Sequence, residues 1–142
     1  MDTKIKHLLT TKPLPLLTIP ADKLVLEAID VMNAYKIGCL LVVEHEELVG
    51  VFTERDVLTK VIGKFDPKVT YIHQVMTQKP LTISLETTVR EAMQIVNGKR
   101  FRHLPVMDEN KIVGLISSGD LMHWMVEMQE GELKDLHKYI EG

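Results

Sequence analysis

The chain has 142 residues, of which 45% are hydrophobic and 26% are charged, a composition typical of one compact domain or two very small ones. Its net charge is −3, no basic block stands out and no apolar run approaches the roughly 20 residues that span a bilayer, so we expect neither a nucleic-acid nor a membrane partner. Cys39 is the single cysteine, which excludes an internal disulfide and a cysteine-rich zinc site.

The N-terminal residues match a transit peptide only faintly. They carry Lys4, Lys6 and Lys12 against one acid, Asp2, but no arginine. They also run directly into apolar residues that the fold needs. We therefore interpret this segment as mature protein and expect a cytoplasmic location.

Residues 18–56 and 82–120 are two copies of one module, aligned without a gap at a spacing of 64 residues. Eleven of the 39 aligned positions are identical, among them Gly50 with Gly114. Internal repetition of this extent outranks every other signal in the sequence. It predicts two structurally equivalent units.

Each copy predicts a strand, at 17–19 or 81–83, followed by a helix. The apolar residues of this helix recur at i, i+3, i+4 and i+7, which is the pattern of a helix that buries one face. They are Val25, Ala28, Ile29 and Met32 in the first copy and Val89, Ala92, Met93 and Val96 in the second.

Two further strands joined by an acidic turn come next in each copy, which is the pattern of a hairpin. They span 39–43 and 48–52 in the first copy and 104–107 and 112–116 in the second. A second helix begins near Glu54 or Ser118, so the order of elements is β-α-β-β-α.

A unit of about 60 residues buries little core on its own. We therefore expect an α/β (α+β) fold of two tandem β-α-β-β-α repeats packed sheet to sheet around a pseudo-twofold axis. Repeat 1 is predicted at 5–62, repeat 2 at 69–128 and a C-terminal tail at 129–142. The tail has apolar residues at i, i+3 and i+7, which predicts a short amphipathic helix after Gly131. They are Leu133, Leu136 and Ile140.

A turn of the form Gly-apolar-apolar-Thr/Ser-x-x-Asp occurs at 50–56 and again at 114–120. A hydroxyl residue with an acid three positions later forms a capping box, which satisfies free amides at the start of a helix. A carboxylate at this place could also accept hydrogen bonds from two ribose hydroxyls, each contributing ~1.5–3 kcal/mol. The residues alone leave both interpretations open.

These turns, the repeat, and the run Arg102, His103 and Leu-Pro-Val on a hairpin strand together resemble a CBS-domain pair (Bateman module). The resemblance covers roughly residues 5–128 and extends to stand-alone CBS-pair proteins. It implies a regulatory module that binds AMP, ADP, ATP, S-adenosylmethionine or NAD(H) between its repeats, with AMP preferred. It further implies a homodimer and an unknown regulated protein that receives the signal.

The resemblance implies two nucleotide-binding clefts, each built from both repeats. In the first, Asp56 would bind ribose, and Arg102 and His103 would bind phosphates. This cleft would comprise Thr53, Arg55, Asp56, Thr70, Ile72, Val75, Arg102 and His103. The second would comprise Leu8, Leu9, Gly38, Cys39, Leu40, Ser117 and Asp120.

The two copies differ where the basic pair occurs. The second copy has Arg102 and His103, whereas the first has Gly38 and Cys39 at the aligned positions. We therefore expect the first cleft to bind phosphorylated nucleotides better. Three alternatives stay open for the second cleft: it is empty, it binds its ligand weakly, or it suits a less anionic adenosine ligand.

Two other functions are alternatives to ligand sensing. A ligand-free dimerisation or interaction module is favoured by the missing cations of the first copy. An enzyme is disfavoured, because the chain has no nucleophile elbow, P-loop or Rossmann glycine pattern. We expect no catalytic residue, no catalytic cofactor and no metal site, since the histidines lack metal-like spacing.

Overall fold

The computed structural model describes residues 3–11, 16–99 and 101–141. In chain order its elements are α1 (Ile5–Thr11), β1 (Thr18–Pro20), α2 (Val25–Tyr35), β2 (Cys39–Glu44), β3 (Glu47–Thr53), α3 (Glu54–Asp56), η1 (Val57–Val61), α4 (Ile72–Val75), β4 (Thr77–Gln78), β5 (Ile83–Ser84), α5 (Val89–Lys99), β6 (His103–Asp108), β7 (Lys111–Ser117) and α6 (Ser118–Glu141). The predicted β-α-β-β-α order is confirmed in both copies. The sequence missed α1, α4 and β4.

The strands form two sheets, ordered β1-β2-β3-β4 and β5-β6-β7, which match except for the added strand β4. In each, the first strand pairs in parallel with the next, and the hairpin strands pair antiparallel. The hairpin registers are equivalent, since Cys39 lies opposite Thr53 and His103 lies opposite Ser117. The structure therefore repeats the 64-residue symmetry of the sequence.

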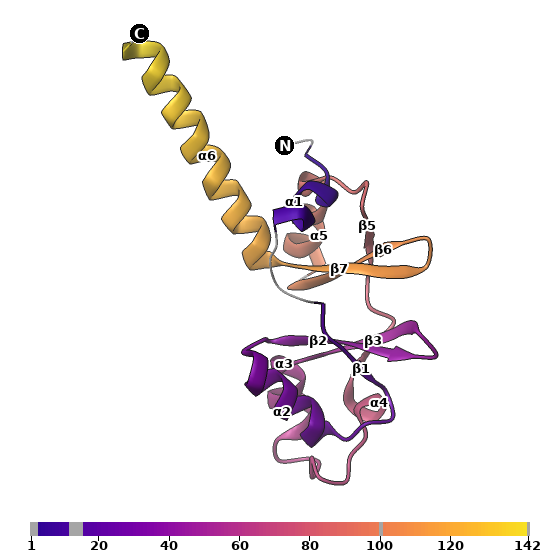
Figure 1. The fold of residues 1–142 in the computed structure, drawn as a ribbon. Coiled ribbons are helices and arrows are strands. Elements are labelled where there is room, and N and C mark those ends of the chain that lie inside the picture. The colour runs from indigo at the N-terminus through magenta and orange to yellow at the C-terminus, as the bar shows by residue number, and fades with distance from the viewer. Residues whose placement is uncertain (1–2, 12–15, 100, 142) are drawn as a thin grey trace.

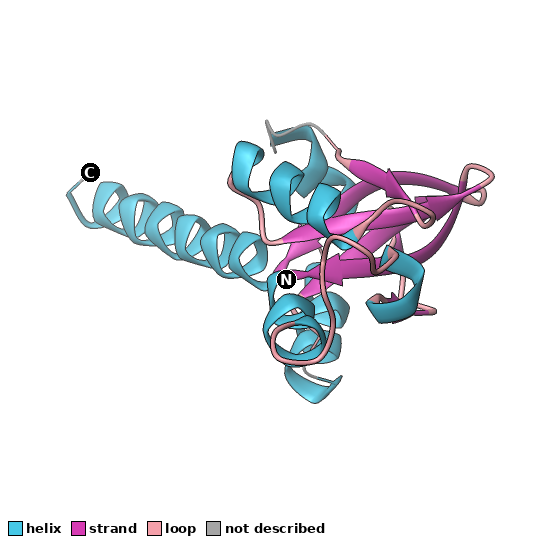
Figure 2. Cartoon of the chain, turned by 90° about the horizontal axis from the view of Figure 1, so that it is seen from below, coloured by secondary structure: helices cyan, strands magenta, loops and turns pink. Residues whose placement is uncertain are grey.

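The two sheets face each other, with the helices on their outer sides (Figures 1 and 2). Side chains alternate along β2, as the pleat of a strand requires. Leu40 and Val42 enter the core beneath α2, whereas Cys39 and Leu41 belong to a cluster that contacts Leu115 of the other sheet. The predicted fold class, with repeats packed sheet to sheet, is confirmed.

The short helices α1 and α4 are exchanged between the repeats. Although α1 precedes repeat 1, Ile5 is buried in the core of repeat 2, and its amide donates to the Thr87 carbonyl at 2.8 Å. In the same way α4 precedes repeat 2, yet Ile72 is buried in the core of repeat 1, and its amide donates to the Lys23 carbonyl at 2.9 Å. Each spatial unit is therefore completed by a segment from the other half of the chain.

The second helices of the two repeats differ most. In repeat 1 the helix continues from α3 into the π-helical turn η1, where the Ile62 amide donates to the Val57 carbonyl at 3.0 Å. In repeat 2 the long helix α6 projects away from the sheets (Figure 1). Across the described residues, no helix is long and apolar enough to cross a membrane.

The C-terminal tail is helical but is not a separate element. α6 runs unbroken from Ser118 to Glu141, whereas the sequence predicted a new helix after Gly131. One glycine costs a helix only about 1 kcal/mol relative to alanine, and good helix formers flank this one. The side chains of Leu133, Leu136 and Ile140 lie outside the described residues.

Candidate functional site

Two cavities lie between the repeats, and each contains one of the repeated aspartate turns. The first, here called the Asp56 cleft, has a volume of about 340 Å³. Five of its lining residues were predicted from the sequence. They are Thr53, Arg55, Asp56, Arg102 and His103. Side chains from the start of α3 and from the start of β6 therefore line one cavity, as a cross-built cleft requires.

The turn at the start of α3 holds Asp56 by reciprocal hydrogen bonds. The Thr53 hydroxyl accepts from the Asp56 amide at 3.1 Å, and the Thr53 amide donates to Asp56 Oδ2 at 3.0 Å. Ser117 and Asp120 repeat this geometry at 3.0 and 2.7 Å. Both turns are thus capping boxes, and each also fixes a carboxylate at the edge of a cavity.

The Asp56 carboxylate is buried and receives two further donors. Its Oδ1 accepts from the ammonium group of Lys60 at 3.0 Å and from the hydroxyl of Thr77 at 3.2 Å. Lys60 lies four residues after Asp56, on the same helical face. Thr77 arrives on β4, which pairs with β3 at Gly50 and Val51.

Neither Lys60 nor Thr77 was predicted from the sequence, although both line the Asp56 cleft. The spacing of an acid and a lysine at i and i+4 could have indicated Lys60. No local signal could have indicated Thr77, because its place depends on the pairing of β4 with the other repeat.

Three residues predicted for the Asp56 cleft do not line it. Ile72 and Val75 are buried in the core of repeat 1, and Thr70 is buried with its hydroxyl donating to the Asp66 carbonyl at 2.8 Å. The physical reason is that α4 uses its apolar residues to complete that core. The segment reaches the cavity only two residues after α4, at Thr77.

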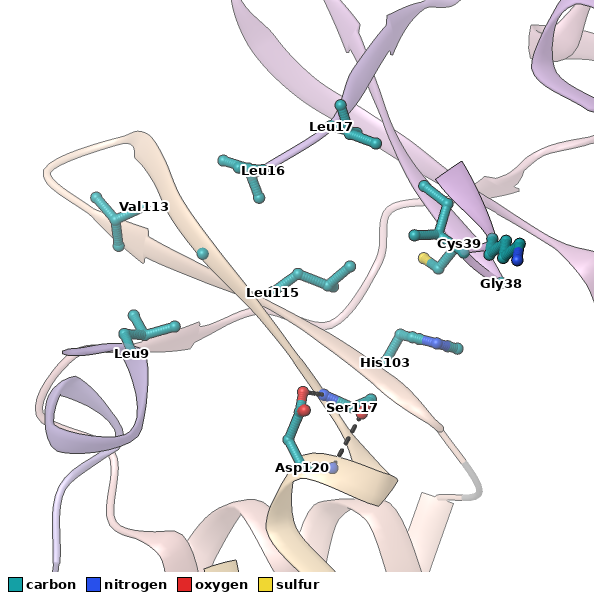
Figure 3. Close-up of a pocket in the computed structure, with 13 residues that line it drawn as sticks. Leu9, Leu16, Leu17, Gly38, Cys39, His103, Val113, Leu115, Ser117 and Asp120 are labelled. Atoms are coloured by element: carbon teal, nitrogen blue, oxygen red, sulfur yellow. Dashed lines mark hydrogen bonds between the residues drawn. The ribbon is translucent and has the colours of Figure 1, made fainter. Parts of the chain in front are cut away.

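The second cavity, here called the Asp120 cleft, has a volume of about 390 Å³ and is lined by more apolar residues and fewer charged ones. Leu9, Gly38, Cys39, Ser117 and Asp120 were predicted from the sequence and line it (Figure 3). The sequence missed several apolar residues on its walls. They are Leu16, Leu17, Ile37, Val113 and Leu115. An apolar cleft with one carboxylate at its edge suits a flat, mostly uncharged group beside a diol.

Leu8 and Leu40 were predicted for the Asp120 cleft but do not line it. Leu40 faces the core beneath α2 because neighbouring residues of a strand point to opposite faces, and its neighbour Cys39 takes the cleft side. Leu8 is buried in the core of repeat 2, whereas the next residue of α1, Leu9, turns toward the cleft.

The two clefts differ in the cations on their walls. Arg55, Lys60 and Arg102 line the Asp56 cleft, whereas Lys36 lines the Asp120 cleft, and His103 contributes to both. The aligned position of Arg102 is Gly38, where an added Cβ would lie 2.9 Å from Glu54 Oε1. The end of the Glu54 side chain would therefore have to shift if position 38 carried an arginine.

A CBS-domain family model matches residues 5–63 and 72–127 of the chain. The mitochondrial CBS domain-containing protein CBSX3 of Arabidopsis thaliana is 37% identical over 128 residues, which cover 85% of this chain and 62% of that protein. The CBSCBSPB1 protein of the same plant is 29% identical over 80% of this chain. The chain thus spans about three fifths of the length of the first relative and 21% of the second.

Solved structures give the same result for the fold. A protein with CBS domains from Burkholderia ambifaria MC40-6 is 34% identical, with a TM-score of 0.84 over 88% of this chain and 95% of that one. CBSX2, crystallised in complex with AMP, has a TM-score of 0.76 over 88% of this chain and 97% of that one. Its sequence is 19% identical, so this likeness concerns the fold alone.

Proposed function

Because the chain belongs to the CBS-domain family and carries a pair of such domains, we propose that it is a regulatory module that binds an adenosine nucleotide, AMP foremost, between its repeats. One observation carries this proposal. Asp56 of repeat 1 and Arg102 of repeat 2 line the same cavity. A carboxylate accepts hydrogen bonds from a ribose diol, and a guanidinium group binds phosphate in a bidentate manner.

The Asp56 cleft is the proposed site for the phosphorylated ligand. Three cationic side chains and His103 line it beside the carboxylates of Glu54 and Asp56, and the Thr53 hydroxyl adds a donor for a phosphate or ribose oxygen. Charge-assisted hydrogen bonds are roughly twice as strong as neutral ones, so these walls favour an anion. The fold neighbour CBSX2 was crystallised with AMP, a ligand of this chemistry.

The Asp120 cleft is proposed to take a less anionic adenosine ligand or to bind AMP more weakly. Its leucines and valine offer an apolar slot for a purine ring, and Asp120 lies at the edge of that slot. Lys36 is its cationic lining residue among those described, and His103 adds an imidazole. Fewer cations leave each phosphate with fewer charged donors.

Regulation follows from the way in which each cleft is built. A ligand that contacts both repeats stabilises the arrangement in which both walls reach it, and it can shift the population of states only by this difference in affinity. A partner protein that recognises that arrangement would then respond to the ligand. We accordingly propose signalling to a partner and not catalysis.

We further propose that the module forms a homodimer. Leu58 and Ile62 follow α3 as exposed apolar side chains, and Met122 and Val126 are exposed at the positions 64 residues later on α6. Two related apolar patches thus lie on the second helices of the repeats. A symmetric dimer would bury both, because its interface uses the same patches on each subunit.

A thermal-shift series tests the ligand proposal with AMP, ADP, ATP, S-adenosylmethionine and NADH. A ligand that binds only the folded state raises its stability by RT ln(1 + [L]/Kd), about 2.7 kcal/mol at 100 times Kd. We expect AMP to raise the Tm of the wild type and to raise that of Asp56→Ala much less. No shift with any of the five compounds would favour the ligand-free interaction module instead.

A further inference from the structure

The Asp56 carboxylate that should bind ribose already has most of its acceptor positions in use. Lys60 and Thr77 donate to Oδ1, and the Thr53 amide donates to Oδ2. The Thr77 hydroxyl also lies 3.5 Å from Oδ2, and the carboxylate side chain is only 7% exposed. A carboxylate has about four lone-pair positions. Three donors leave about one position open, so a ribose diol can donate both of its hydroxyls to Asp56 only after one of these donors leaves.

Of the three donors, Lys60 is the one able to leave. The Thr53 amide is part of the backbone that begins α3, and Thr77 is held by the pairing of β4 with β3. The Lys60 side chain lines the cleft, is 41% exposed and carries its ammonium group on a flexible stem. Besides Asp56, this group donates to the Thr77 hydroxyl at 3.3 Å. The ammonium group can swing toward the cavity without any change in the backbone.

A phosphate group of the ligand would give the Lys60 ammonium group a new partner in place of Asp56. An ammonium group that moves from a carboxylate to a phosphate exchanges one charge-assisted hydrogen bond for another. An uncharged nucleoside offers the ammonium group no such partner. The ion pair therefore opposes the binding of a ribose that arrives without a phosphate.

We propose that Lys60 is a specificity-determining residue, which makes ribose binding at Asp56 conditional on an anionic phosphate in the same ligand. This inference rests on the proposed function and adds a rule of selection to it. The Asp56 cleft would select nucleotides over nucleosides by exchanging the Asp56–Lys60 ion pair for a Lys60–phosphate pair and an Asp56–ribose pair.

The second repeat supplies an internal comparison. The residue 64 positions after Lys60 is Trp124, which packs against the core of repeat 2 and carries no ammonium group. The rule should accordingly apply to the Asp56 cleft alone. Any selection measured at the Asp120 cleft must have another origin.

The experiment compares AMP with adenosine by isothermal titration in an Asp120→Ala background, which isolates the Asp56 cleft. We expect this background to bind AMP more tightly than adenosine. Adding Lys60→Met should lower the ratio of the two affinities by about tenfold or more, the size expected for one charge-assisted hydrogen bond. AMP should bind more weakly, and adenosine should bind as well as before or better.

Two variants serve as controls. Lys64→Met removes the same charge from the same segment, but Lys64 donates to the Thr59 carbonyl at 3.0 Å and does not line the cleft. It should leave the ratio unchanged. Lys60→Arg keeps a mobile cation and should retain the preference for AMP.

An unchanged ratio in Lys60→Met, with AMP still bound, would overturn this inference and leave the proposed function intact. No AMP binding by the wild type would overturn both. If Lys60→Met does not unfold cooperatively, Lys60→Gln replaces it, because its amide can still donate to Asp56 without a charge. An unchanged ratio in Lys60→Gln overturns the inference equally.

Discussion

Gly50 and Thr77 approach so closely that a Cβ added to Gly50 would lie 2.8 Å from the Thr77 carbonyl oxygen and 2.6 Å from Met76 Sδ. This approach lets β4 pair with β3 and brings the Thr77 hydroxyl to Asp56. In repeat 2 the three atoms nearest to a Cβ added at the equivalent glycine, Gly114, all belong to the side chain of Leu9, the nearest at 2.6 Å. One sequence motif thus supports a backbone contact in one cleft and a side-chain contact in the other.

Alanine at these two glycines should have unequal effects. Gly50→Ala has to displace the β4 backbone and should lower the free energy of unfolding by about 1–3 kcal/mol, the usual cost of overpacking. Gly114→Ala should cost less, because the end of the Leu9 side chain can move. Urea denaturation of both variants checks this. Equal stabilities would mean that the backbone contact does not constrain the fold.

The side chains that the exchanged helices bury should stabilise the fold as much as other core side chains do. Ile5 of α1 and Ile72 of α4 are both fully buried. Ile5→Ala and Ile72→Ala should each lower the free energy of unfolding by about 2–5 kcal/mol, the range for large-to-small changes in a core. Denaturant unfolding measures the loss, with the exposed Val69→Ala as the control. A loss no greater than that of the control would show that these helices are only loosely attached.

The docking of α1 should weaken in acid. Hydrogen bonds from Lys4 and, next, Lys6 hold the pKa of the Glu86 carboxyl below its usual value. Because the folded state favours the ionised form, this contribution is complete above the usual pKa and is lost as pH falls through the lowered one. Glu86→Gln should therefore lower the Tm slightly at neutral pH and not at all in strong acid.

The size of this effect should depend on salt. All three side chains are well exposed, and exposed ion pairs contribute little. At about 1 M salt the Debye length is about 3 Å, so the Tm difference between wild type and Glu86→Gln should shrink. A difference that persists in both acid and high salt would have to come from packing.

Charge placed on the exposed apolar patches should separate the proposed dimer. Leu58→Glu together with Met122→Glu would put a carboxylate on each patch, where burial without a partner is costly. Light scattering after size exclusion should then give the mass of a monomer, against a dimer for the wild type. Thr59→Glu, on the same segment but at a polar position, is the control. A monomeric wild type would contradict the proposed assembly.

The sequence predicted the β-α-β-β-α order well because the repeat aligned each of those strands and helices with its copy. The aspartate turns and Arg102 were also identifiable, since they form local motifs. The exchange of α1 and α4 was missed, because nothing near Ile72 shows which core it completes. Because α4 completes the core of repeat 1, Thr70, Ile72 and Val75 lie outside the predicted cleft, and Thr77 lies in it.

Other differences also arise where a local pattern leaves the tertiary partner open. The alternation along β2 predicts that Leu40 and Cys39 lie on opposite faces of the sheet. It does not predict which of the two faces the cleft. The Asp56–Lys60 spacing is common on exposed helices. Its meaning depends on the burial of Asp56, which follows from the packing of the two sheets.

Isothermal titration of AMP into the wild type, Asp56→Ala, Asp120→Ala and the double variant tests the account most directly. We expect tight binding by the wild type, a larger loss of affinity in Asp56→Ala than in Asp120→Ala, and no binding by a double variant that still unfolds cooperatively. AMP bound by the folded double variant with wild-type affinity would contradict it.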